Sequence, residues 1–517
     1  MDMGQETELK FIGPEEALAR VRQKSLFRRF ARGRKAKTRA MHAVYFDTET
    51  FALREAGYVL RVRNEDGGFV QTVKSVNGPD LATRVEIKVN VESLAPDLAA
   101  IPDKAVRRDL KAALGGGTLA PMFSVEMRRT TVLLTPKRGT SIEAAFDVGA
   151  IKTAGDKPSS LPVVEFELEL LAGDANELVA CARGLTADLP LMLFLQSKAE
   201  RGYALAADAA EAPVTAEDIA VTDDATADVA FRYVVAHCLK HLLGNWAAVT
   251  VARDPEGIHQ MRVALRRLRS ALSLFGGPFR AALSKLEDEV RWVAGVMGAA
   301  RDLDVFQEDV FRPAAEAHGE DDRLLELATV VRTRRRIAWV HVFEALESER
   351  FRRLVLELAS ATFAKPWLDA TIGGDEAIEP ARDFARRRMQ RRYRRAVRLG
   401  RRITELDAAE RHELRIKLKK LRYGLDFFRS LFAKQATQKF LKRLSDLQDT
   451  LGRLNDAAVA NALVEEILNE NGDGAAAAAI GYAGGLVAGW HLGHARLRVR
   501  QLERRWARLA KLGPPWR

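Results

Sequence analysis

The sequence predicts an α+β N-terminal domain made mainly of strands, followed by an all-α C-terminal domain. Short segments with period-two alternation fill the first 207 positions, a pattern typical of half-buried strands. Long amphipathic segments rich in Arg, Leu and Ala follow from residue 229 onward, and their period indicates helices. The 517 residues are also too many for one ordinary domain.

The strand-like segments of the first part are separated by turn signals such as Asn77-Gly78-Pro79. One helix is expected from Pro14 to Arg29. The predicted strands include Tyr58–Arg63, Phe69–Val73, Thr83–Val91, Met127–Leu134, Ser141–Val148 and Val163–Leu170.

An acidic stretch separates the two parts. Residues 208–228 hold seven acidic and no basic residues, and Pro213 lies among them. We therefore expect one domain at 1–207, a linker at 208–222 and a helical domain at 223–512. A break between helices is expected at the Gly- and Ala-rich residues 472–485.

The basic residues are unevenly distributed. The net charge is +3 over residues 1–207 and +16 over residues 229–517, and a basic field of that size favours a polyanionic partner. Nucleic acid, polyphosphate and an anionic membrane surface all satisfy this requirement. No run of about 18 apolar residues predicts a membrane span, and no apolar signal region begins the chain. Two cysteines, Cys181 and Cys238, fit a reducing cytoplasm, where we expect the protein.

Charged residues recur two positions apart on the predicted strands. Glu6, Glu8 and Lys10 share one strand face, because successive side chains point to opposite faces. A solvated strand face explains any single row. Acidic and basic rows alternate between strands, however, so a sheet closed into a barrel would place them in a tunnel. The other rows are Arg61/Arg63, Thr72/Lys74, Arg84/Glu86, Glu143/Asp147 and Glu165/Glu167/Glu169.

Such a tunnel suits a compact polyanion and a metal ion together. Triphosphate needs several Lys and Arg contacts, and its cleavage needs a divalent cation that neutralises charge and orients water. Mg²⁺ and Mn²⁺ prefer carboxylate oxygens. The first part is therefore predicted to be a metal-dependent phosphohydrolase acting on inorganic triphosphate or a close relative.

These motifs, taken in order, resemble the CYTH, or triphosphate tunnel metalloenzyme, superfamily over nearly all of residues 4–207. Glu6-x-Glu8-x-Lys10 is similar to the signature at its start. The further matches are Tyr45-Phe46-Asp47-Thr48, Leu60-Arg61-Val62-Arg63, Thr72-Val73-Lys74, Arg84-Val85-Glu86, Arg129, Asp147, Glu165-Phe166-Glu167 and Ser197-Lys198-Ala199-Glu200-Arg201-Gly202-Tyr203.

The resemblance implies an eight-stranded antiparallel β-barrel tunnel with flanking helices, which hydrolyses triphosphate with Mg²⁺ or Mn²⁺. The chain departs from the family at Lys88, where many members carry Glu. Arg128 is an alternative to Arg129, and Glu169 is either a tunnel carboxylate or a rim residue. The implied catalytic residues are Glu6, Glu8, Lys10, Glu86 and Asp147; those binding substrate are Lys10, Arg61, Arg63, Lys74, Arg84, Arg129 and Lys198; and those binding metal are Glu6, Glu8, Glu165 and Glu167.

The helical part contains an internal repeat. His259, Arg262, Arg266 and Arg269 recur at the spacing of His412, Arg415, Lys419 and Arg422, which keeps each set on one helical stripe. Gly298-x-x-Arg301-Asp302 likewise aligns with Gly452-x-x-Asn455-Asp456. A solvated helix face explains either stripe alone. The repulsion between like charges in both copies favours an anionic ligand.

The paired motifs resemble the CHAD domain, a conserved histidine α-helical domain, over roughly residues 223–510. The resemblance implies two repeated four-helix units whose stripes face a shared groove and bind inorganic polyphosphate. Arg386 to Arg395 either extend this basic surface or form a solvated helix face. The implied polyphosphate-binding residues are His259, Arg262, Arg266, Arg269, His412, Arg415, Lys419 and Arg422.

The leading hypothesis is thus a cytoplasmic triphosphatase joined to a polyphosphate-binding module, which would also direct it to polyphosphate granules. One alternative is a non-catalytic protein that binds polyphosphate or nucleotide. Another is an adenylate cyclase of the same superfamily. Specific nucleic-acid binding is not expected, because only 7% of residues are aromatic and single-stranded recognition uses aromatic stacking.

Overall fold

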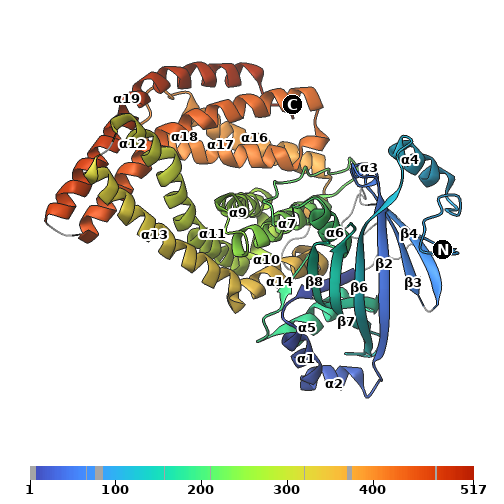
Figure 1. Ribbon diagram of the computed structural model, residues 1–517. Coiled ribbons are helices and arrows are strands. Elements are labelled where there is room, and N and C mark those ends of the chain that lie inside the picture. The colour runs from blue at the N-terminus through green and yellow to red at the C-terminus, as the bar shows by residue number, and fades with distance from the viewer. Residues whose placement is uncertain are drawn as a thin grey trace. The chain divides into compact units, whose positions relative to one another are not determined.

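The computed structural model describes residues 7–65, 67–75, 86–155, 158–209, 211–319, 321–368, 375–471 and 474–516 (Figure 1). The chain divides into two compact units. The first unit contains Met1–Pro213, Leu243–Ala252 and Glu347–Ala364, and the second contains Val214–Leu242, Arg253–Leu346 and Lys365–Arg517.

The first unit is built on a nine-stranded antiparallel sheet with the order β5-β4-β3-β2-β6-β7-β8-β1-β9. One more strand is present than the eight expected, because the short β9 pairs with Phe11 and Ile12 of β1. Strands β5 and β9 end the order, and no pairing joins them within the described residues. The sheet is therefore open there, and the closed barrel stays a prediction. The strands are β1 Thr7–Ile12, β2 Lys37–Asp47, β3 Tyr58–Glu65, β4 Gly68–Ser75, β5 Glu86–Val91, β6 Ala120–Leu134, β7 Ser141–Thr153, β8 Ser160–Ala172 and β9 Met192–Leu193.

Alternation gives the sheet one apolar face, which helices cover. Phe11, Phe166 and Phe146 lie opposite one another on β1, β8 and β7, and their rings stack with centroid distances of 6.0 and 5.0 Å. Helices α1 (Glu15–Gln23) and α5 (Ala175–Thr186) pack on β8, and α2 (Ser25–Ala31) packs on β6 (Figure 1). The charged residues two apart from each other on the same strands therefore project from the opposite face.

The single helix expected from Pro14 to Arg29 is wrong, since the chain forms α1 and α2 instead. Lys24 between them has extended backbone angles, φ −60° and ψ 137°. Its Nζ donates to the carbonyl oxygens of Gly184, at 3.3 Å, and Ala187, at 2.5 Å. These acceptors lie at the C-terminal end of α5, where carbonyls lack helical partners and attract cations. The hydrophobic periodicity of residues 14–29 could not predict this contact, because α5 lies far away in the sequence.

The first unit also includes two helices from beyond residue 207, α8 (Trp246–Thr250) and α14 (Glu349–Ala364). Helix α14 packs on α5 and on β9, and Phe351, Val355 and Leu358 are fully buried. Arg183 of α5 donates from Nε and Nη2 to the Glu357 carboxylate at 2.6 and 2.5 Å. The sheet unit is therefore completed by residues far beyond position 207.

The second unit is helical in its described residues. Helix α9 packs on α11 and α17, and α17 also packs on α16 and α18. The equivalent pairs α9/α11 and α17/α18 carry the two repeated motifs, while the full pair of four-helix units stays a prediction. The helices that enter the unit are α7 Ala227–Gly244, α9 Pro255–Phe275, α10 Gly277–Ala282, α11 Ser284–Val305, the π-helix Phe306–Phe311, α12 Arg312–His318, α13 Asp322–Glu347, α15 Asp375–Ile378, α16 Ala381–Gly400, α17 Ala408–Phe427, α18 Lys434–Asn471 and α19 Ala475–Leu512.

The break expected at 472–485 is much shorter than predicted. Helix α18 ends at Asn471 and α19 begins at Ala475, directly after Gly474 with φ 147°. Alanine is the best helix former, so the Ala run extends the helix rather than interrupting it. None of the helices in the described part of the chain carries an apolar stretch of the length that crossing a bilayer requires.

Part of the stretch expected to be a linker is packed within the second unit. Ile219 and Val221 are 1% and 3% exposed. The Val221 N–H donates to Ser430 Oγ at 2.9 Å, and Ser430 Oγ donates to the Val221 carbonyl at 2.8 Å. These contacts fix the end of the acidic stretch before α7 begins.

Candidate active site and basic groove

Strand register brings charged residues of the sheet unit into one row. Arg129 of β6 lies opposite Asp147 of β7, and Asp147 lies opposite Glu165 of β8. On the next row, Glu167 of β8 lies opposite Lys10 of β1. Directly opposed residues share a face in an antiparallel sheet, so four strands present these five side chains together.

Three carboxylates form the centre of this arrangement, and we call Asp147, Glu165 and Glu167 the carboxylate centre. Each offers an oxygen within 4.8 Å of the others. Asp147 and Glu165 are fully buried and Glu167 is 9% exposed. Three converging carboxylate oxygens fit Mg²⁺ or Mn²⁺, which are hard cations with oxygen ligands. Asp147 thus belongs with the metal-capable residues, a group in which the sequence interpretation did not place it.

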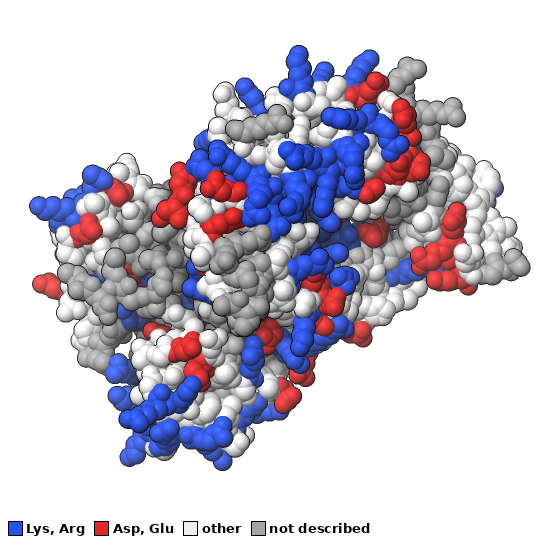
Figure 2. All heavy atoms as spheres, turned by 180° about the vertical axis from the view of Figure 1, so that it is seen from behind, with Lys and Arg blue, Asp and Glu red and all other residues white. Residues whose placement is uncertain are grey.

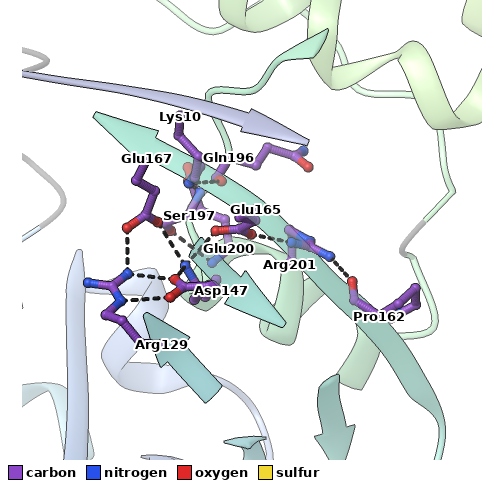
Figure 3. A network of polar contacts seen from close by, with 11 residues as sticks. Lys10, Arg129, Asp147, Pro162, Glu165, Glu167, Gln196, Ser197, Glu200 and Arg201 are labelled. Carbon is purple, nitrogen blue, oxygen red and sulfur yellow. Dashed lines mark hydrogen bonds and ion pairs between the residues drawn. The ribbon is translucent and has the colours of Figure 1, made fainter. Parts of the chain in front are cut away.

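Three cations surround the carboxylate centre (Figure 3). Lys198 Nζ lies 2.9 Å from Asp147 Oδ2, 2.5 Å from Glu165 Oε2 and 2.8 Å from Glu167 Oε1. Arg129 donates from Nε and Nη2 to both oxygens of Asp147 at 2.7 and 2.6 Å, and Nη2 also contacts Glu167. Arg201 Nη1 donates to Glu165 Oε1 at 2.5 Å, and its other end reaches the Pro162 carbonyl.

The surrounding charges favour the ionised forms of Glu167 and Lys198. Burial opposes ionisation of Glu167, but Lys198, Arg129 and Lys10 outweigh it and lower its pKa to about 2. Burial likewise opposes the charge of Lys198, yet the three carboxylates raise its pKa above the ordinary lysine value. The site is therefore a compensated set of charges rather than an acidic patch.

Local structure explains why Lys198 and Arg201 lie there. Both belong to α6 (Lys198–Ala206), which begins at Ser197. The Ser197 hydroxyl accepts from the Glu200 N–H at 3.1 Å, and the Glu200 carboxylate accepts from the Ser197 N–H at 2.8 Å. This capping box fixes the first turn of the helix, and Lys198 and Arg201, three positions apart, then project on one side.

Glu8 and Lys10 extend the same face along β1. Lys10 Nζ donates to the Gln196 carbonyl at 2.6 Å, which places it beside the segment leading into α6. Glu8 keeps access to solvent, while desolvation by the surrounding protein and repulsion from Glu167 raise its pKa to about 7. Near neutral pH the Glu8 carboxyl group therefore exchanges a proton, whereas Glu167 is ionised there.

A second cluster lies on β3, β4 and β5. Glu86 is 3.2 Å from Lys74, 3.5 Å from Lys88 and 3.7 Å from Arg61. Burial opposes its ionisation, but Lys74 and Lys88 hold its pKa below the usual range. Lys88 is thus a third cation, with Arg61 and Lys74, beside the Glu86 carboxylate.

Arg63 connects the two clusters electrostatically. Burial, together with repulsion from Arg61 and Arg129, lowers its pKa to about 10. Arg61 keeps a buried Nε without a hydrogen-bond partner among the described residues. Cations that repel one another and retain donor capacity are suited to an anionic ligand.

The structure also resolves some alternatives. Arg128 is exposed and lies on the face opposite that of Arg129, so Arg129 is the arginine of the carboxylate centre. Glu169 lies between Glu8 and Glu143 on neighbouring strands, on the charged face. Glu6 and Arg84 lie outside the described residues.

Asp47 has a structural task that the motif did not reveal. Its carboxylate accepts from the N–H groups of Leu53 and Arg54, at 2.8 and 3.0 Å, and from the Tyr203 hydroxyl at 3.0 Å. Asp47 is fully buried and joins the end of β2 to α3 (Ala52–Glu55) and α6. Arg201 was likewise not assigned a role from sequence, although its position three residues after Lys198 was a usable signal.

In the second unit the two basic stripes converge. Lys419 of α17 is half-buried; burial and the charges of Arg415, Arg266, Arg422 and Arg262 lower its pKa to about 7. Arginines of both stripes therefore repel the same Lys419 ammonium group. We call the surface formed by Arg262 and Arg266 of α9 and Arg415, Lys419 and Arg422 of α17 the basic groove.

The repeated glycines support the arginines of the basic groove. A Cβ at Gly298 would lie 3.0 Å from Arg262 Nη1, and one at Gly452 would lie 3.8 Å from Arg415 Nη2. Arg262 also donates to the Met297 carbonyl at 3.2 Å and pairs with Asp302 at 3.3 Å. The Gly-x-x-x-Asp motif of the first copy thus lets an arginine lie against α11 and holds its guanidinium.

The two histidines and Arg269 of the repeated motifs differ in their exposure to solvent. His259 is part-buried, and burial with repulsion from Arg301 lowers its pKa, whereas His412 is exposed. Arg269 is exposed on α9, and burial together with the charges of Arg392 and Arg269 lowers the pKa of Lys420. The part of Arg269 in polyphosphate binding stays a prediction.

The Arg-rich segment 386–395 lies on α16, where Arg392 bonds to neighbouring helices and several other arginines are exposed. Arg392 donates to the Lys420 carbonyl at 2.5 Å and the Ser270 carbonyl at 3.2 Å, so it ties α16 to α17 and α9. Arg386, Arg391 and Arg394 are exposed. Figure 2 shows one face of the molecule on which Lys and Arg side chains gather densely.

Comparisons with known proteins match both parts of the chain. Residues 4–203 match the CYTH domain and residues 233–465 match the CHAD domain. A solved CHAD domain from the plant Ricinus communis is 34% identical, with a TM-score of 0.51, covering 59% of this chain and 98% of that chain. Two uncharacterized proteins of Mycobacterium tuberculosis, from strains CDC 1551 and H37Rv, are each 25% identical over 417 residues, 75% of this chain and 75% of each relative.

Proposed function

Because the chain belongs to the CYTH family through residues 4–203 and to the CHAD family through residues 233–465, we propose that it hydrolyses inorganic triphosphate in its first unit and binds polyphosphate with its second. The observation that carries the proposal is the carboxylate centre, bordered by basic side chains on the same face of one sheet. A pure anion binder gains little from buried carboxylates, since each must be compensated by a cation.

Asp147, Glu165 and Glu167 would hold Mg²⁺ or Mn²⁺ together with Glu8 of β1, which interacts electrostatically with Glu167, and Glu6 is proposed as a further ligand. A divalent ion bound there neutralises phosphate charge and orients the attacking water. Lys10, Arg61, Arg63 and Lys74 would hold the phosphate oxygens, joined by Arg84, Arg129 and Lys198 in the full set. Glu8, with a pKa near 7, is suited to accept a proton from water at neutral pH.

Glu86 would orient the basic side chains of the second cluster. It lies within 3.7 Å of Arg61, Lys74 and Lys88, and it restrains all three at the far end of the phosphate chain. Lys88 adds a positive charge there, which favours a substrate carrying several negative charges. The proposal includes the closed tunnel, because a triphosphate surrounded by strands contacts both clusters at once.

The basic groove supports polyphosphate binding by the second unit. Arg262, Arg266, Arg415, Lys419 and Arg422 repel one another, and an anionic polymer relieves that repulsion. Buried donors at His259 Nδ1, Arg301 Nε and Arg422 Nε have no hydrogen-bond partner among the described residues. Two repeated four-helix units, one for each stripe, belong to this proposal, as does placement of the protein at polyphosphate granules.

A substrate panel tests the proposal. The full chain is assayed with tripolyphosphate, thiamine triphosphate, ATP and longer polyphosphate, each with Mg²⁺ and with Mn²⁺. We expect phosphate release from tripolyphosphate that stops on chelation of the metal. Binding of tripolyphosphate without phosphate release favours a non-catalytic binding protein, and conversion of ATP to cyclic AMP favours a cyclase.

A further inference from the structure

Lys198 holds a position among the carboxylates that no other described cation shares. Its ammonium contacts all three members of the carboxylate centre at 2.5 to 2.9 Å. Of the three carboxylates, Arg129 pairs with Asp147 and Glu167, and Arg201 pairs with Glu165. Lys198 is thus the cation at the point where the three carboxylates converge.

A divalent cation bound by the same oxygens would need that point. Mg²⁺ lies about 2.1 Å from its oxygen ligands, and the three oxygens lie within 4.8 Å of one another. An ammonium and a metal ion cannot both fill a space of that size. Either Lys198 leaves when the metal binds, or the metal binds elsewhere.

The surroundings make Lys198 the exchangeable partner. Each arginine is held through two of its nitrogens. Arg129 donates from Nε and Nη2 to both oxygens of Asp147, and Arg201 donates from Nη1 to Glu165 and from Nη2 to the Pro162 carbonyl. Lys198 is instead held through one ammonium nitrogen on a flexible four-carbon stem, and its hydrogen bonds and ion pairs with described residues are those with the three carboxylates. Its release leaves the arginines in place.

We infer that Lys198 occupies the metal position in the metal-free protein and is released to the phosphate chain when a divalent cation binds the carboxylate centre. This inference rests on the proposed metal-dependent function. Its consequence is an ordered site: the carboxylates stay compensated when empty, and a lysine becomes available to the anion only when the metal is present. Metal and anion should therefore bind with positive cooperativity.

The test compares two variants that each remove one positive charge from Glu165. Lys198→Met removes the ammonium at the convergence point, and Arg201→Met removes a guanidinium beside it. The Mn²⁺ dissociation constant is measured by titration calorimetry without substrate, at pH 8.5, where protons compete least for the carboxylates. Lys198→Gln is measured as well, and thermal unfolding reports whether each variant is folded.

We expect Lys198→Met and Lys198→Gln to bind Mn²⁺ at least about tenfold more tightly than the wild type, a change of about 1.4 kcal/mol, and Arg201→Met to gain much less. We also expect Mn²⁺ to strengthen tripolyphosphate binding in the wild type and not in either Lys198 variant. Unchanged or weaker Mn²⁺ binding by a folded Lys198 variant, or an equal gain in Arg201→Met, overturns the exchange. Absence of Mn²⁺ binding in all proteins, wild type included, instead contradicts the proposed function.

Discussion

Arg129 forms a two-point hydrogen bond with Asp147, from Nε to Oδ1 at 2.7 Å and from Nη2 to Oδ2 at 2.6 Å. The pair links β6 to β7 directly across the register. Asp147 is fully buried, and both Arg129 and Lys198 pair with its carboxylate. The charged face is therefore part of the stability of the sheet as well as its chemistry.

Removing this arginine should destabilise the first unit. Replacement of Arg129 with Met leaves a buried carboxylate with one fewer partner, so we expect a loss of about 3–5 kcal/mol in the free energy of unfolding. Chemical denaturation of the full chain measures it. Arg128→Met is the matched control, because Arg128 is exposed on the opposite face and should change stability by less than about 0.5 kcal/mol. An equal loss of stability in Arg129→Met and Arg128→Met would show that the Arg129–Asp147 pair stabilises the sheet no more than an exposed arginine does.

Reversing charge in the basic groove should weaken polyphosphate binding and leave triphosphate hydrolysis intact. We expect Arg262→Glu combined with Arg415→Glu to lose at least tenfold in affinity, roughly 1.4 kcal/mol, since both arginines act on Lys419. The control is Arg332→Glu with Arg336→Glu on α13, two exposed arginines that impose the same change in net charge. Equal losses in both double variants would mean that net charge alone governs binding.

Binding in the basic groove should depend on pH through Lys419. Its pKa of about 7 lies below the lysine value of 10.5, so the folded protein binds fewer protons there than the unfolded chain between those values. Stability linked to this group therefore falls as the pH drops from 10.5 toward 7. A bound polyanion favours the charged ammonium, so affinity for polyphosphate should rise as the pH is lowered from 8.5 to 6.5, with proton uptake.

Calorimetry in buffers of different ionisation enthalpy measures that proton uptake. Lys419→Met should remove most of the pH dependence and should raise stability near neutral pH, because it deletes a cation from among four arginines. Lys420→Met is the control on the adjacent exposed position. If the pH dependence of polyphosphate binding survives in Lys419→Met and vanishes in Lys420→Met, the titrating group is Lys420 and the assignment to Lys419 is wrong.

A chain ended at residue 207 should be less stable than the first unit within the full chain. It lacks α14, whose buried Phe351, Val355 and Leu358 belong to a helix packed on α5 and β9, and it lacks the partner of Arg183. We expect a lower unfolding temperature and aggregation driven by the uncovered apolar surface. Hydrogen exchange in α5 and β1 measures local opening. Protection in the shortened chain equal to that in the full chain would contradict this role for α14.

The sequence predicted the alternating charged and apolar faces of β1, β7 and β8 well, because a period of two is set by strand geometry. It also predicted the pairing of stripes on α9 and α17, since duplication brings equivalent residues into equivalent places. These successes depend on local periodicity and on family resemblance. They required no knowledge of long-range contacts.

Three of the differences from the sequence prediction arise from contacts between residues far apart in the chain. Lys24 breaks a helical segment because its ammonium reaches the end of α5, and α14 joins the sheet unit from about 140 positions beyond the predicted boundary. The role of Asp147 in the carboxylate centre depends on cross-strand register, which turn signals alone did not fix. The break near Gly474 is shorter than predicted for a local reason, because the high helix propensity of the Ala run lets α19 begin at Ala475.

The central claim is that the carboxylate centre serves metal-dependent cleavage of triphosphate. Phosphate release from tripolyphosphate with Mn²⁺ is measured for the wild type, for Glu165→Gln and for Glu126→Gln, whose exposed carboxylate pairs with Lys152 on the other face. We predict wild-type turnover in Glu126→Gln and loss of at least about a hundredfold, roughly 2.7 kcal/mol of transition-state stabilisation, in a folded Glu165→Gln protein. Wild-type turnover in folded Glu165→Gln would contradict the account.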